Sequence, residues 1–448
     1  MHIDFLLDVF RANHARDAVV WRERSISYGW LVDAVDRWGR SLADASIAPG
    51  TVVSLESDFS PTAIALLLAL VEHGCIVVPL TSSVEMKKPE FRAIAQVEAI
   101  VSVGADDQAR PELTAARTSH ELFTSLRSAR HPGLVLFSSG STGKSKAALH
   151  DFVPLLEKFK VPRHPLRTLT FLLFDHIGGV NTLLYVLSNA GCIVTVQDRS
   201  PQVVCAAIEK HRVQLLPTSP TFVNLLLASE AYNDHDLSSL ELVTYGTEVM
   251  PESTLARFHR LFPRIRLLQT YGLSEVGILR SQSRSSDSLW VKVGGDGFET
   301  RVVDGMLQIR AQSAMLGYLN APSPFTPDGW LPTGDAVEVD GEYLRIHGRQ
   351  SEIINVGGEK VYPAEVESVL QCMEGVQDVS VSGEPHRITG QIVTAKVRLG
   401  TGETLPEFRG RMRLFCRDRL PAFKIPQKVV FVDEALHGER FKKMRRAS

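Results

Sequence analysis

The chain has 448 residues, of which 44% are hydrophobic, 22% charged and 7% aromatic, and this length predicts about two to four domain-sized units. The 49 Lys and Arg residues against 51 Asp and Glu give a formal charge of −2, which argues against a surface built to grip nucleic acid or an anionic membrane. Ordinary apolar content, with 32 Gly and 23 Pro, also excludes collagen-like and disordered classes.

The start of the chain and the cysteines indicate the expected compartment. Asp4 precedes any apolar stretch, so the start lacks the basic segment and long apolar segment of a signal peptide. The longest apolar run, residues 63–71, is closed by Glu72, well short of the roughly 20 residues that cross a bilayer. The five cysteines are scattered and form no CxxC pair. We therefore expect a cytoplasmic protein without membrane insertion.

Through the first two-thirds of the chain, short runs rich in Val and Ile alternate with helical patterns. The runs expected to be strands are residues 75–80, 134–139, 170–174, 192–196 and 240–246. Residues 60–74 and 178–191 have the apolar spacing of buried helices, with Gly74 and Gly191 as expected C-caps. Strands that alternate with helices predict parallel sheets covered on both faces, so this part is α/β.

The pattern changes after about residue 285. Asp304-Gly305 and Asp340-Gly341 are hairpin-type turns flanked by alternating residues, which predicts antiparallel strands. Beyond residues 349–352 the chain predicts a small α+β domain of about one hundred residues. Its expected helices are residues 363–373 and 405–420, and its expected strands are residues 379–383, 392–399 and 428–434.

Residues 134–148 predict a strand that runs into a loop of Ser, Gly and Thr with Lys144 and Lys146. Such a loop offers hydroxyls, approachable backbone N–H groups and positive charge, which suit a polyphosphate. One interpretation is a P-loop that ends in Gly143-Lys144-Ser145, although Ser138 stands where its first glycine belongs. That interpretation would make the chain a kinase or NTPase.

The same loop resembles the signature of the adenylate-forming superfamily, which includes acyl-CoA synthetases, adenylation domains of peptide synthetases and luciferases. The family loop is close to Ser/Thr-Ser-Gly-Ser/Thr-Thr-Gly-x-Pro-Lys, and this chain departs from it at Ser145. The resemblance implies that the loop cradles the β- and γ-phosphates of ATP. The residues it implies are Ser138, Ser139, Gly140, Ser141, Thr142, Gly143 and Lys146.

Further stretches resemble the family's other signatures, in the same order. Tyr271-Gly272-Leu273-Ser274-Glu275 is similar to Tyr-Gly-x-Ser/Thr-Glu, which implies that Tyr271 packs on adenine, Ser274 touches phosphate and Glu275 approaches Mg²⁺. A carboxylate suits Mg²⁺, a hard ion that takes one or two carboxylates besides phosphate oxygens. Upstream, Tyr245-Gly246-Thr247-Glu248 occupies the place of the family's Gly-rich stretch along the adenine and acyl pocket.

Residues 330–335 match the family pattern Trp-x-x-Thr-Gly-Asp, so the resemblance implies that Asp335 accepts hydrogen bonds from ribose hydroxyls. Arg349 is then placed to contact ribose or phosphate, next to a hinge position where Ser351 replaces the usual Asp or Lys. In residues 355–367, the pair Gly357 and Gly358 is implied to line the pantetheine path of coenzyme A.

The resemblance covers nearly the whole chain and implies its domain organisation. Residues 1–348 form a large AMP-binding domain of two α/β subdomains plus a β-barrel-like portion. Residues 349–352 are the hinge, and residues 353–448 form a small, mobile α+β C-terminal domain.

The resemblance also implies a catalytic lysine near the C-terminus, in a pattern close to Leu-Pro-x-Thr-x-x-Gly-Lys-Ile/Val-x-Arg. Counting forward from Leu436 and back from Arg446 places it at Lys443, with Lys442 in the place of the glycine. Which of the two lysines is catalytic stays open at this point.

Residues 174–179 resemble the family's segment beside the acyl pocket, commonly Phe-His-x-x-Gly, and this alignment puts His176 in the gating position. Shifted by one residue, Phe174-Asp175 is similar to the Phe-Asp of amino-acid-activating domains, whose Asp anchors the substrate ammonium. The alignment therefore leaves the substrate class open.

The sequence thus predicts an ATP- and Mg²⁺-dependent acid ligase. A small-molecule carboxylic acid would first form an acyl-adenylate with release of pyrophosphate. The acyl group would then pass to coenzyme A or to the phosphopantetheine of a carrier protein. The alternatives are an amino-acid-activating or amide-forming ligase, the P-loop enzyme, and a non-catalytic binding protein. Between residues 405 and 448 there are 12 Lys and Arg but only 5 Asp and Glu, which suits a phosphate-rich nucleotide better than nucleic acid.

Overall fold

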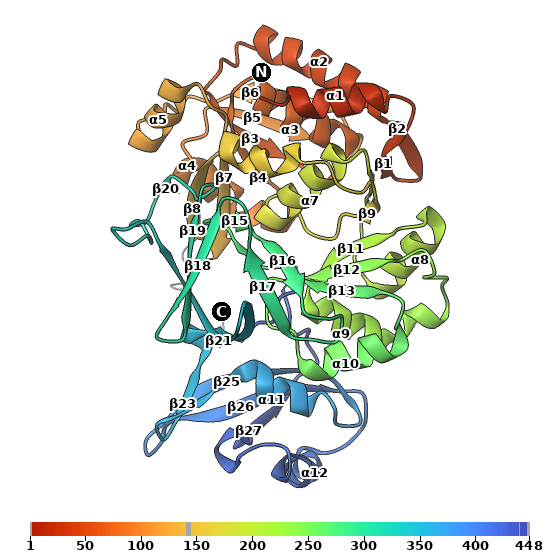
Figure 1. The fold of residues 1–448 in the computed structure, drawn as a ribbon, viewed down its shortest axis with the longest axis vertical. Coiled ribbons are helices and arrows are strands. Elements are labelled where there is room, and N and C mark those ends of the chain that lie inside the picture. The colour runs from red at the N-terminus through yellow and green to blue at the C-terminus, as the bar shows by residue number, and fades with distance from the viewer. Residues whose placement is uncertain (1, 140–144, 439, 446–448) are drawn as a thin grey trace.

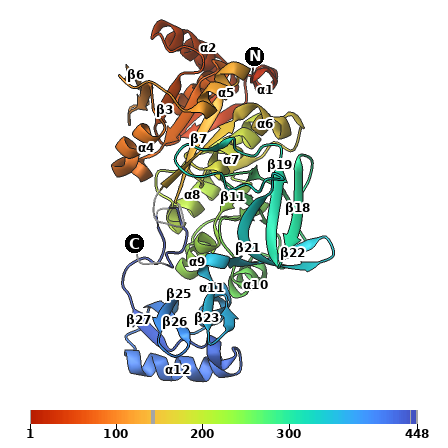
Figure 2. The same cartoon turned by 90° about the vertical axis from the view of Figure 1, so that its left-hand side faces the viewer.

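The computed structural model describes residues 2–139, 145–438 and 440–445 (Figures 1 and 2). Two seven-stranded sheets and a six-stranded sheet make up most of the first 349 residues, and a five-stranded sheet follows. Figure 1 shows this last part, in blue, at one end of the elongated molecule.

The first seven-stranded sheet carries the segment before the signature loop. Its strands, in spatial order, are β20 (Gly317–Tyr318), β8 (Ser145–Asp151), β7 (Gly133–Ser139), β4 (Ile76–Leu80), β3 (Val52–Glu56), β5 (Ala99–Val103) and β6 (Ala109–Leu113). Strands β7, β4, β3 and β5 run parallel, whereas β8, β20 and β6 pair antiparallel at the edges. The expected strands at 75–80 and 134–139 are confirmed.

The second seven-stranded sheet has a parallel body with one antiparallel edge strand, β2. Its strands, in spatial order, are β13 (Arg266–Gln269), β12 (Leu242–Tyr245), β11 (Leu215–Thr218), β9 (Arg167–Leu169), β10 (Cys192–Val194), β1 (Asp17–Trp21) and β2 (Arg24–Ser27). The parallel α/β architecture expected for the first two-thirds is therefore confirmed.

Helices cover both faces of the two sheets. They are α1 (Asp4–Ala12), α2 (Tyr28–Asp44), α3 (Pro61–Glu72), α4 (Lys88–Ile94), α5 (Glu121–Ala129), α6 (Phe152–Leu156), α7 (Ile177–Ser188), α8 (Pro201–His211), α9 (Pro220–Ser229) and α10 (Glu252–Leu261). Short 3₁₀ turns are η1 (Ser82–Lys87), η2 (Glu157–Lys160), η3 (Ala231–Asn233), η4 (Gln350–Glu352) and η5 (Ala422–Lys424).

One helical layer lies between the sheets. A single hydrophobic cluster joins α1, α2, α3 and α7 to strands of both sheets. On β7, Leu134 and Leu136 face this cluster, whereas Val135 and Phe137 face the cluster that includes α4 and α5. This alternation is what a strand's geometry requires. Helix α3 is buried along almost its whole length, which explains why its sequence is apolar on every side.

Two local expectations were wrong. Residues 170–174 are not a strand: the strand ends at Leu169, and the buried Phe171 and Phe174 lie in an irregular segment that leads into α7. Gly191 is not the left-handed cap of α7, because Ala190 takes that conformation with φ +52°. Gly191 is needed for space instead, since a Cβ there would lie 2.6 Å from the Leu166 carbonyl oxygen.

An antiparallel six-stranded sheet follows, as the hairpin turns at 304–305 and 340–341 predict. Its strands, in spatial order, are β16 (Arg280–Ser283), β17 (Trp290–Gly294), β22 (Tyr343–Arg349), β21 (Leu331–Asp340), β19 (Met306–Ala311) and β18 (Phe298–Val303). A two-stranded hairpin, β14 (Gly272–Leu273) and β15 (Gly277–Ile278), precedes it.

Residues 354–431 contain a five-stranded sheet with its own hydrophobic cluster. The strands are β23 (Ile354–Val356), β24 (Glu359–Val361), β25 (Val376–His386), β26 (Gly390–Leu399) and β27 (Lys428–Phe431), and the helices are α11 (Pro363–Leu370) and α12 (Leu405–Arg417). We call residues 353–445 the C-terminal unit and residues 2–348 the N-terminal unit. In the described residues no helix is long and apolar enough to cross a membrane.

Candidate active site

The two strands that flank the signature loop are paired, with Ser138 opposite Lys146 on β7 and β8. Residues 140–144 lie outside the described residues, and so do the expectations placed on Gly140, Ser141, Thr142 and Gly143. Nothing is described of the Ser139 side chain. The strand residues on the two sides of the loop therefore lie side by side, near the edge of the sheet where β20 pairs with β8.

Tyr318 on β20 connects the loop lysine to the predicted metal ligand. Its hydroxyl donates to Glu275 Oε1 at 2.5 Å, and the Lys146 ammonium lies 5.1 Å from the centre of its ring. Burial, followed by the charge of Glu275, raises the pKa of Tyr318, so the hydroxyl keeps its proton and donates. Tyr318 could not be predicted from the sequence, because a lone aromatic residue on a two-residue strand carries no pattern.

Asn320, also missed, fixes the start of β8. Its Oδ1 accepts from the Ala147 N–H at 3.0 Å, and its Nδ2 donates to the Ser145 carbonyl at 2.8 Å. Both bonds join chain segments 173 or more residues apart. The strand that presents Lys146 is therefore held by hydrogen bonds on two sides.

His150 supports the segment that carries Ser274 and Glu275. Its Nε2 lies 2.6 Å from the Ser274 carbonyl oxygen, to which the ring donates. Burial lowers the pKa of His150 to about 4, so the imidazole is neutral near pH 7. The Met315 N–H donates to the Glu275 carbonyl at 2.7 Å from the other side. Glu275 is thus held through both its side chain and its backbone.

Tyr271, Asp335 and Arg349 form a second cluster. The Tyr271 hydroxyl donates to Asp335 Oδ2, and Arg349 Nε pairs with Asp335 Oδ1 at 2.8 Å. Strand register explains the ion pair, because Asp335 on β21 lies directly opposite Arg349 on β22. Burial raises the pKa of Asp335, and Arg349, Tyr271 and Lys442 oppose that rise. The cluster therefore fixes a buried carboxylate that can accept from ligand hydroxyls.

The carboxyl ends of three parallel strands meet next to this cluster. Thr218, Tyr245 and Gln269 are in register on β11, β12 and β13, so the segments that follow them start side by side. At such an edge, ligands of open α/β sheets commonly bind. A Cβ on Gly246 would lie 2.7 Å from Thr270 Oγ1, so only glycine fits there. Thr247 has a left-handed backbone, with φ +73°.

Tyr245 does not present its side chain to this edge. The residue is 1% exposed and packs in the cluster beneath the second sheet. Strand alternation explains this, because it turns the ring into the core. The expectation that residues 245–248 border a ligand stays a prediction. Gly272 packs closely against Ile278, its partner in the hairpin of β14 and β15, since a Cβ on Gly272 would lie 2.5 Å from the Ile278 side chain.

Glu248 faces the C-terminal unit. One carboxylate oxygen accepts from the Thr221 N–H at 2.8 Å, and the other accepts from the Lys443 N–H at 3.1 Å. The residue lines a small pocket between the units together with Glu367 and Arg445. The structure thus gives Glu248 a contact with the chain tail that the sequence did not suggest.

His176 begins helix α7 and caps it, because its Nδ1 accepts from the Gly178 N–H at 3.1 Å. Burial, followed by the charges of Arg440 and Lys442, lowers the pKa of His176 to about 3. The partly exposed ring is therefore neutral near pH 7. It can shape a pocket or donate a hydrogen bond, but it is poorly suited to proton transfer.

The Lys443 side chain turns away from the other predicted residues, although its N–H donates to Glu248. Its Nζ donates to the Val379 carbonyl at 2.5 Å and pairs with Asp378 Oδ1 at 3.4 Å, inside the C-terminal unit. Its side chain is 5% exposed and that of Asp378 2%. Lys443 therefore has a buried structural partner, which conflicts with the expectation that it meets ligand.

Lys442 points the other way. Its charge lowers the pKa of both Asp335 and His176, so it acts on the Asp335 cluster and on the start of α7. Surrounding protein atoms and then Arg349 lower the pKa of Lys442, although the residue as a whole keeps exposed surface. Alternation along the tail explains the difference, because Lys443 forms a bridge with His437 and turns into the C-terminal unit.

Arg445, near the end of the chain, is consistent with aligning Lys442 with the lysine of the family pattern. Arg445 pairs with Glu367 at 2.8 Å and with Glu352 at 2.8 Å. If Arg445 is the arginine of the Lys-x-x-Arg pattern, counting back three positions gives Lys442. Phe441 then stands where the pattern has glycine.

The predicted hinge lies where β22 ends and the 3₁₀ turn η4 begins. Gly357 and Gly358 form the turn between β23 and β24, with φ values of +60° and +93° that favour glycine. Both are exposed, and a Cβ on either would meet open space. These glycines are required by backbone conformation, and the open space leaves room for a ligand.

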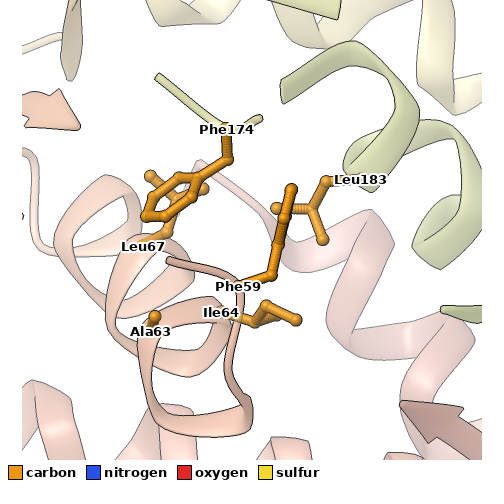
Figure 3. Close-up of a pocket in the computed structure, with 6 residues that line it drawn as sticks. All are labelled: Phe59, Ala63, Ile64, Leu67, Phe174 and Leu183. Atoms are coloured by element: carbon orange, nitrogen blue, oxygen red, sulfur yellow. The ribbon is translucent and has the colours of Figure 1, made fainter. Parts of the chain in front are cut away.

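A small apolar pocket lies beside the segment that carries His176 (Figure 3). It has about 140 Å³ of unfilled space, too narrow for a water molecule, and is lined by Phe59, Ala63, Ile64, Leu67, Phe174 and Leu183. Figure 3 shows the Phe59 and Phe174 rings facing this space. Phe59 comes from the segment just before α3, and Phe174 from the segment just before α7. Without polar groups the cavity cannot hold a nucleotide.

Among the described residues no group of three or more His, Cys, Asp or Glu side chains is placed to hold a metal ion. Glu275 is a single carboxylate, connected through Tyr318 to Lys146 at the end of the signature loop. That arrangement fits Mg²⁺, which binds through one or two carboxylates and through phosphate oxygens.

Comparisons with known proteins agree with this geometry. The model of the AMP-binding enzyme family matches residues 82–319, and that of the AMP-binding enzyme C-terminal domain matches residues 365–442. An indoleacetate–CoA ligase of Aromatoleum aromaticum is 29% identical, covering 94% of this chain and 92% of its own length. A feruloyl-CoA synthase of an Amycolatopsis species is 25% identical, covering 91% of this chain and 90% of its own.

A solved structure of a similar enzyme shares the fold of this chain. The crystal structure of the anthranilate CoA ligase AuaEII in complex with anthranoyl-AMP matches with a TM-score of 0.80 at 21% identity. The match covers 98% of this chain and 95% of that chain, so both units and their order are shared.

Proposed function

Because the chain belongs to the AMP-binding enzyme family, we propose that its cleft residues join a carboxylic acid to coenzyme A at the expense of ATP. The protein is an AMP-forming acid–coenzyme A ligase, a function that also describes the relatives matched along nearly its whole length. The observation that carries the proposal is that Tyr318 joins Lys146 to Glu275, while Asp335 pairs with Arg349 within reach of the charge of Lys442.

In the first step, a carboxylate oxygen attacks the α-phosphorus of ATP, and the bond from that phosphorus to the pyrophosphate oxygen breaks. Both partners are anions, so the site must offset charge as the bond forms. We assign this task to Lys442, because its charge acts on Asp335 while Lys443 is buried against Asp378. This assignment replaces the expectation for Lys443.

The phosphates of ATP lie along the signature loop. Lys146 neutralises part of their charge, and Glu275 holds Mg²⁺, which supplies further charge compensation when bound. Tyr318 orients Glu275, and His150 holds the neighbouring Ser274 carbonyl. The roles of the loop residues 138–143 rest on the resemblance to the family.

The nucleoside lies at the carboxyl edge of the second sheet. Asp335 accepts from the ribose hydroxyls, Arg349 holds that carboxylate in place, and Tyr271 donates to it. Gly246 and Thr247 border the base through their backbone. The acid enters beside His176, whose neutral ring forms part of the pocket wall.

In the second step, the thiol sulfur attacks the acyl carbon of the adenylate, and the acyl–oxygen bond to AMP breaks. Residues 1–348 and 353–448 act as separate domains, and residues 349–352 are the hinge about which the smaller one turns. The turn brings the exposed Gly357 and Gly358 to the pantetheine path, where the lack of side chains admits a narrow ligand. A carrier-protein phosphopantetheine is the alternative acceptor of the same chemistry.

The acid is an aromatic or similarly bulky, largely apolar carboxylate. The proposal is supported by the relatives, which act on indoleacetate and ferulate by name. The pocket segment at residues 174–176 is also apolar on one side, where Phe174 faces the cavity of Figure 3.

The test is acid-dependent release of pyrophosphate and AMP from ATP, across indoleacetate, ferulate, anthranilate, a medium-chain fatty acid and a set of α-amino acids. We expect AMP, with one or more of the aromatic acids preferred, and an acyl-coenzyme A product when coenzyme A is added. Formation of ADP would support the P-loop alternative, and a response to α-amino acids alone would support amino-acid activation.

Lys442→Ala tests the assigned lysine. We expect it to reduce pyrophosphate release by at least about 100-fold while leaving transfer from a preformed acyl-adenylate to coenzyme A intact. If Lys443→Ala alone had this effect in a folded protein, the assignment would be wrong.

A further inference from the structure

Three contacts attach the chain tail to the N-terminal unit, and the first is an ion pair. Arg440 Nη2 lies 3.1 Å from Asp175 Oδ2, between residues 265 positions apart. Asp175 is 4% exposed and also accepts from the Thr81 hydroxyl at 2.8 Å. A buried carboxylate of this kind needs a cation, so the arginine contributes more than a surface pair would.

The second contact is aromatic. The Phe441 ring lies 5.0 Å from Phe171 and 5.6 Å from Phe222, centre to centre, within the hydrophobic cluster of the second sheet. The Arg199 guanidinium lies 5.3 Å from the same ring. The Ser219 hydroxyl donates to the Phe441 carbonyl at 2.6 Å. Both the side chain and the backbone of Phe441 are therefore docked on the N-terminal unit.

The third contact is the bond from the Lys443 N–H to Glu248, whose carboxylate the Thr221 N–H holds in turn. Residues 440, 441 and 443 are thus all attached to the N-terminal unit. Lys442 lies between them, so its backbone is fixed from both sides while its charge acts on Asp335 and His176.

We propose that Arg440, Phe441 and Glu248 are positioning residues that hold Lys442 in place for adenylation and must release the tail before thiol transfer. This inference rests on the proposed function, because it concerns the same lysine. The three residues touch the tail and the N-terminal unit, and none of them is required to touch the reacting atoms.

The conformation of Phe441 indicates that this attachment is a property of this chain. Phe441 has a left-handed backbone, with φ +50°, at the position where the family pattern has glycine. A residue with a side chain pays a conformational cost there that glycine does not. Docking of the ring between Phe171 and Phe222 offsets that cost, and it ties the tail to the N-terminal unit more firmly than a glycine could.

Release of the tail can be measured without knowing the acid. In hydrogen exchange on the unliganded full-length protein, Phe441→Gly and Arg440→Ala should each raise the exchange of amides 441–444 by about tenfold over wild type. Met444→Ala is the matched control, because it removes a side chain that is 48% exposed from the same tail. Phe441→Ala should exchange faster than Phe441→Gly, since alanine loses the ring but keeps the backbone cost.

The two half-reactions complete the test, with the most active acid of the panel described above. Phe441→Gly and Arg440→Ala should slow pyrophosphate release by about tenfold and leave transfer from preformed acyl-adenylate equal or faster. Arg440→Lys should recover part of the loss, because it restores a cation for Asp175.

The proposal is overturned if these variants exchange no faster than Met444→Ala, or if both half-reactions fall equally. A wild-type protein that forms no adenylate from any acid would instead contradict the proposed function, and the exchange measurement would still decide whether the three contacts hold the tail.

Discussion

The Tyr318 hydroxyl donates to Glu275 Oε1 at 2.5 Å, across 43 positions of sequence, and thereby joins a strand edge to the predicted metal ligand. Lys146 lies over the same ring. The ring is therefore a spacer between a cation that meets phosphate and a carboxylate that meets Mg²⁺, and the effect of removing its hydroxyl should depend on the metal.

Tyr318→Phe keeps the ring under Lys146 and removes the bond to Glu275. A hydrogen bond to a charged group contributes about 1.5–3 kcal/mol, so we expect kcat/KM for ATP to fall by about 10- to 100-fold. The fall should be largest at low Mg²⁺ and shrink as Mg²⁺ is raised, measured as pyrophosphate release. Tyr343→Phe, on the hairpin of β21 and β22, is the control. Equal losses at all Mg²⁺ concentrations would contradict the role given to Tyr318.

Asp335→Asn tests ribose recognition. We expect about a 100-fold loss in kcat/KM with ATP, because a charged acceptor of hydroxyl groups is removed. With 2′,3′-dideoxy-ATP, wild type and variant should differ little, since the hydroxyls are already absent. A double-mutant cycle of enzyme and nucleotide gives the interaction directly. Additive losses would mean that Asp335 supports the fold through Arg349 and does not touch ribose.

Lys443→Met should destabilise the C-terminal unit and leave chemistry largely intact. It removes the cation from Asp378, where both side chains are nearly fully buried, at a cost of about 3 kcal/mol. Urea unfolding followed by a probe in residues 353–445 measures this. The double variant Asp378→Asn with Lys443→Met should recover much of the loss. Unchanged stability would mean that the pair does not form.

His150 predicts a pH dependence of stability. Burial lowers its pKa from 6.5 to about 4 in the folded protein, so between these values the unfolded chain binds a proton that the folded protein does not. Stability should therefore fall as pH drops, by about 2 kcal/mol at pH 5 from this residue. His150→Gln keeps a donor for the Ser274 carbonyl. In urea unfolding at pH 7 and pH 5, the free energy of unfolding of this variant should fall by about 2 kcal/mol less than that of wild type.

Gly358→Ala separates the two half-reactions in the opposite sense to Lys442→Ala. Its Cβ would meet open space, so the cost to folding is limited to a left-handed alanine, roughly 1 kcal/mol. We expect slower acyl transfer to coenzyme A with unchanged pyrophosphate release. Slower pyrophosphate release alone would contradict the placement of this turn on the pantetheine path.

Much of the fold could be predicted because its signals are local. The apolar runs at 75–80 and 134–139, the Asp-Gly hairpins and the helix start at Pro363 each depend on neighbours in sequence. The failures involve contacts between distant segments. Ala190 takes the left-handed conformation, and Gly191 instead stands where the Leu166 carbonyl approaches, which no local pattern shows.

The site shows the same division. Asp335 and Arg349 could be assigned from sequence motifs, and strand register brings them together. The lysine could not be assigned, since neither Lys442 nor Lys443 follows a glycine, and counting back from Arg446 or from Arg445 gives different lysines. The proposed choice of Lys442 rests on the turn of the Lys443 side chain toward the buried Asp378.

Helix α3, apolar on all sides and packed between two sheets, has a mechanical consequence. Because it offers no polar face along which the sheets could slide, the first two layers form one rigid block. The C-terminal unit has a separate core, with its own cluster. Under the proposed function, we therefore expect the displacement between the half-reactions at the short joint near residue 350, with the first two layers moving as one body.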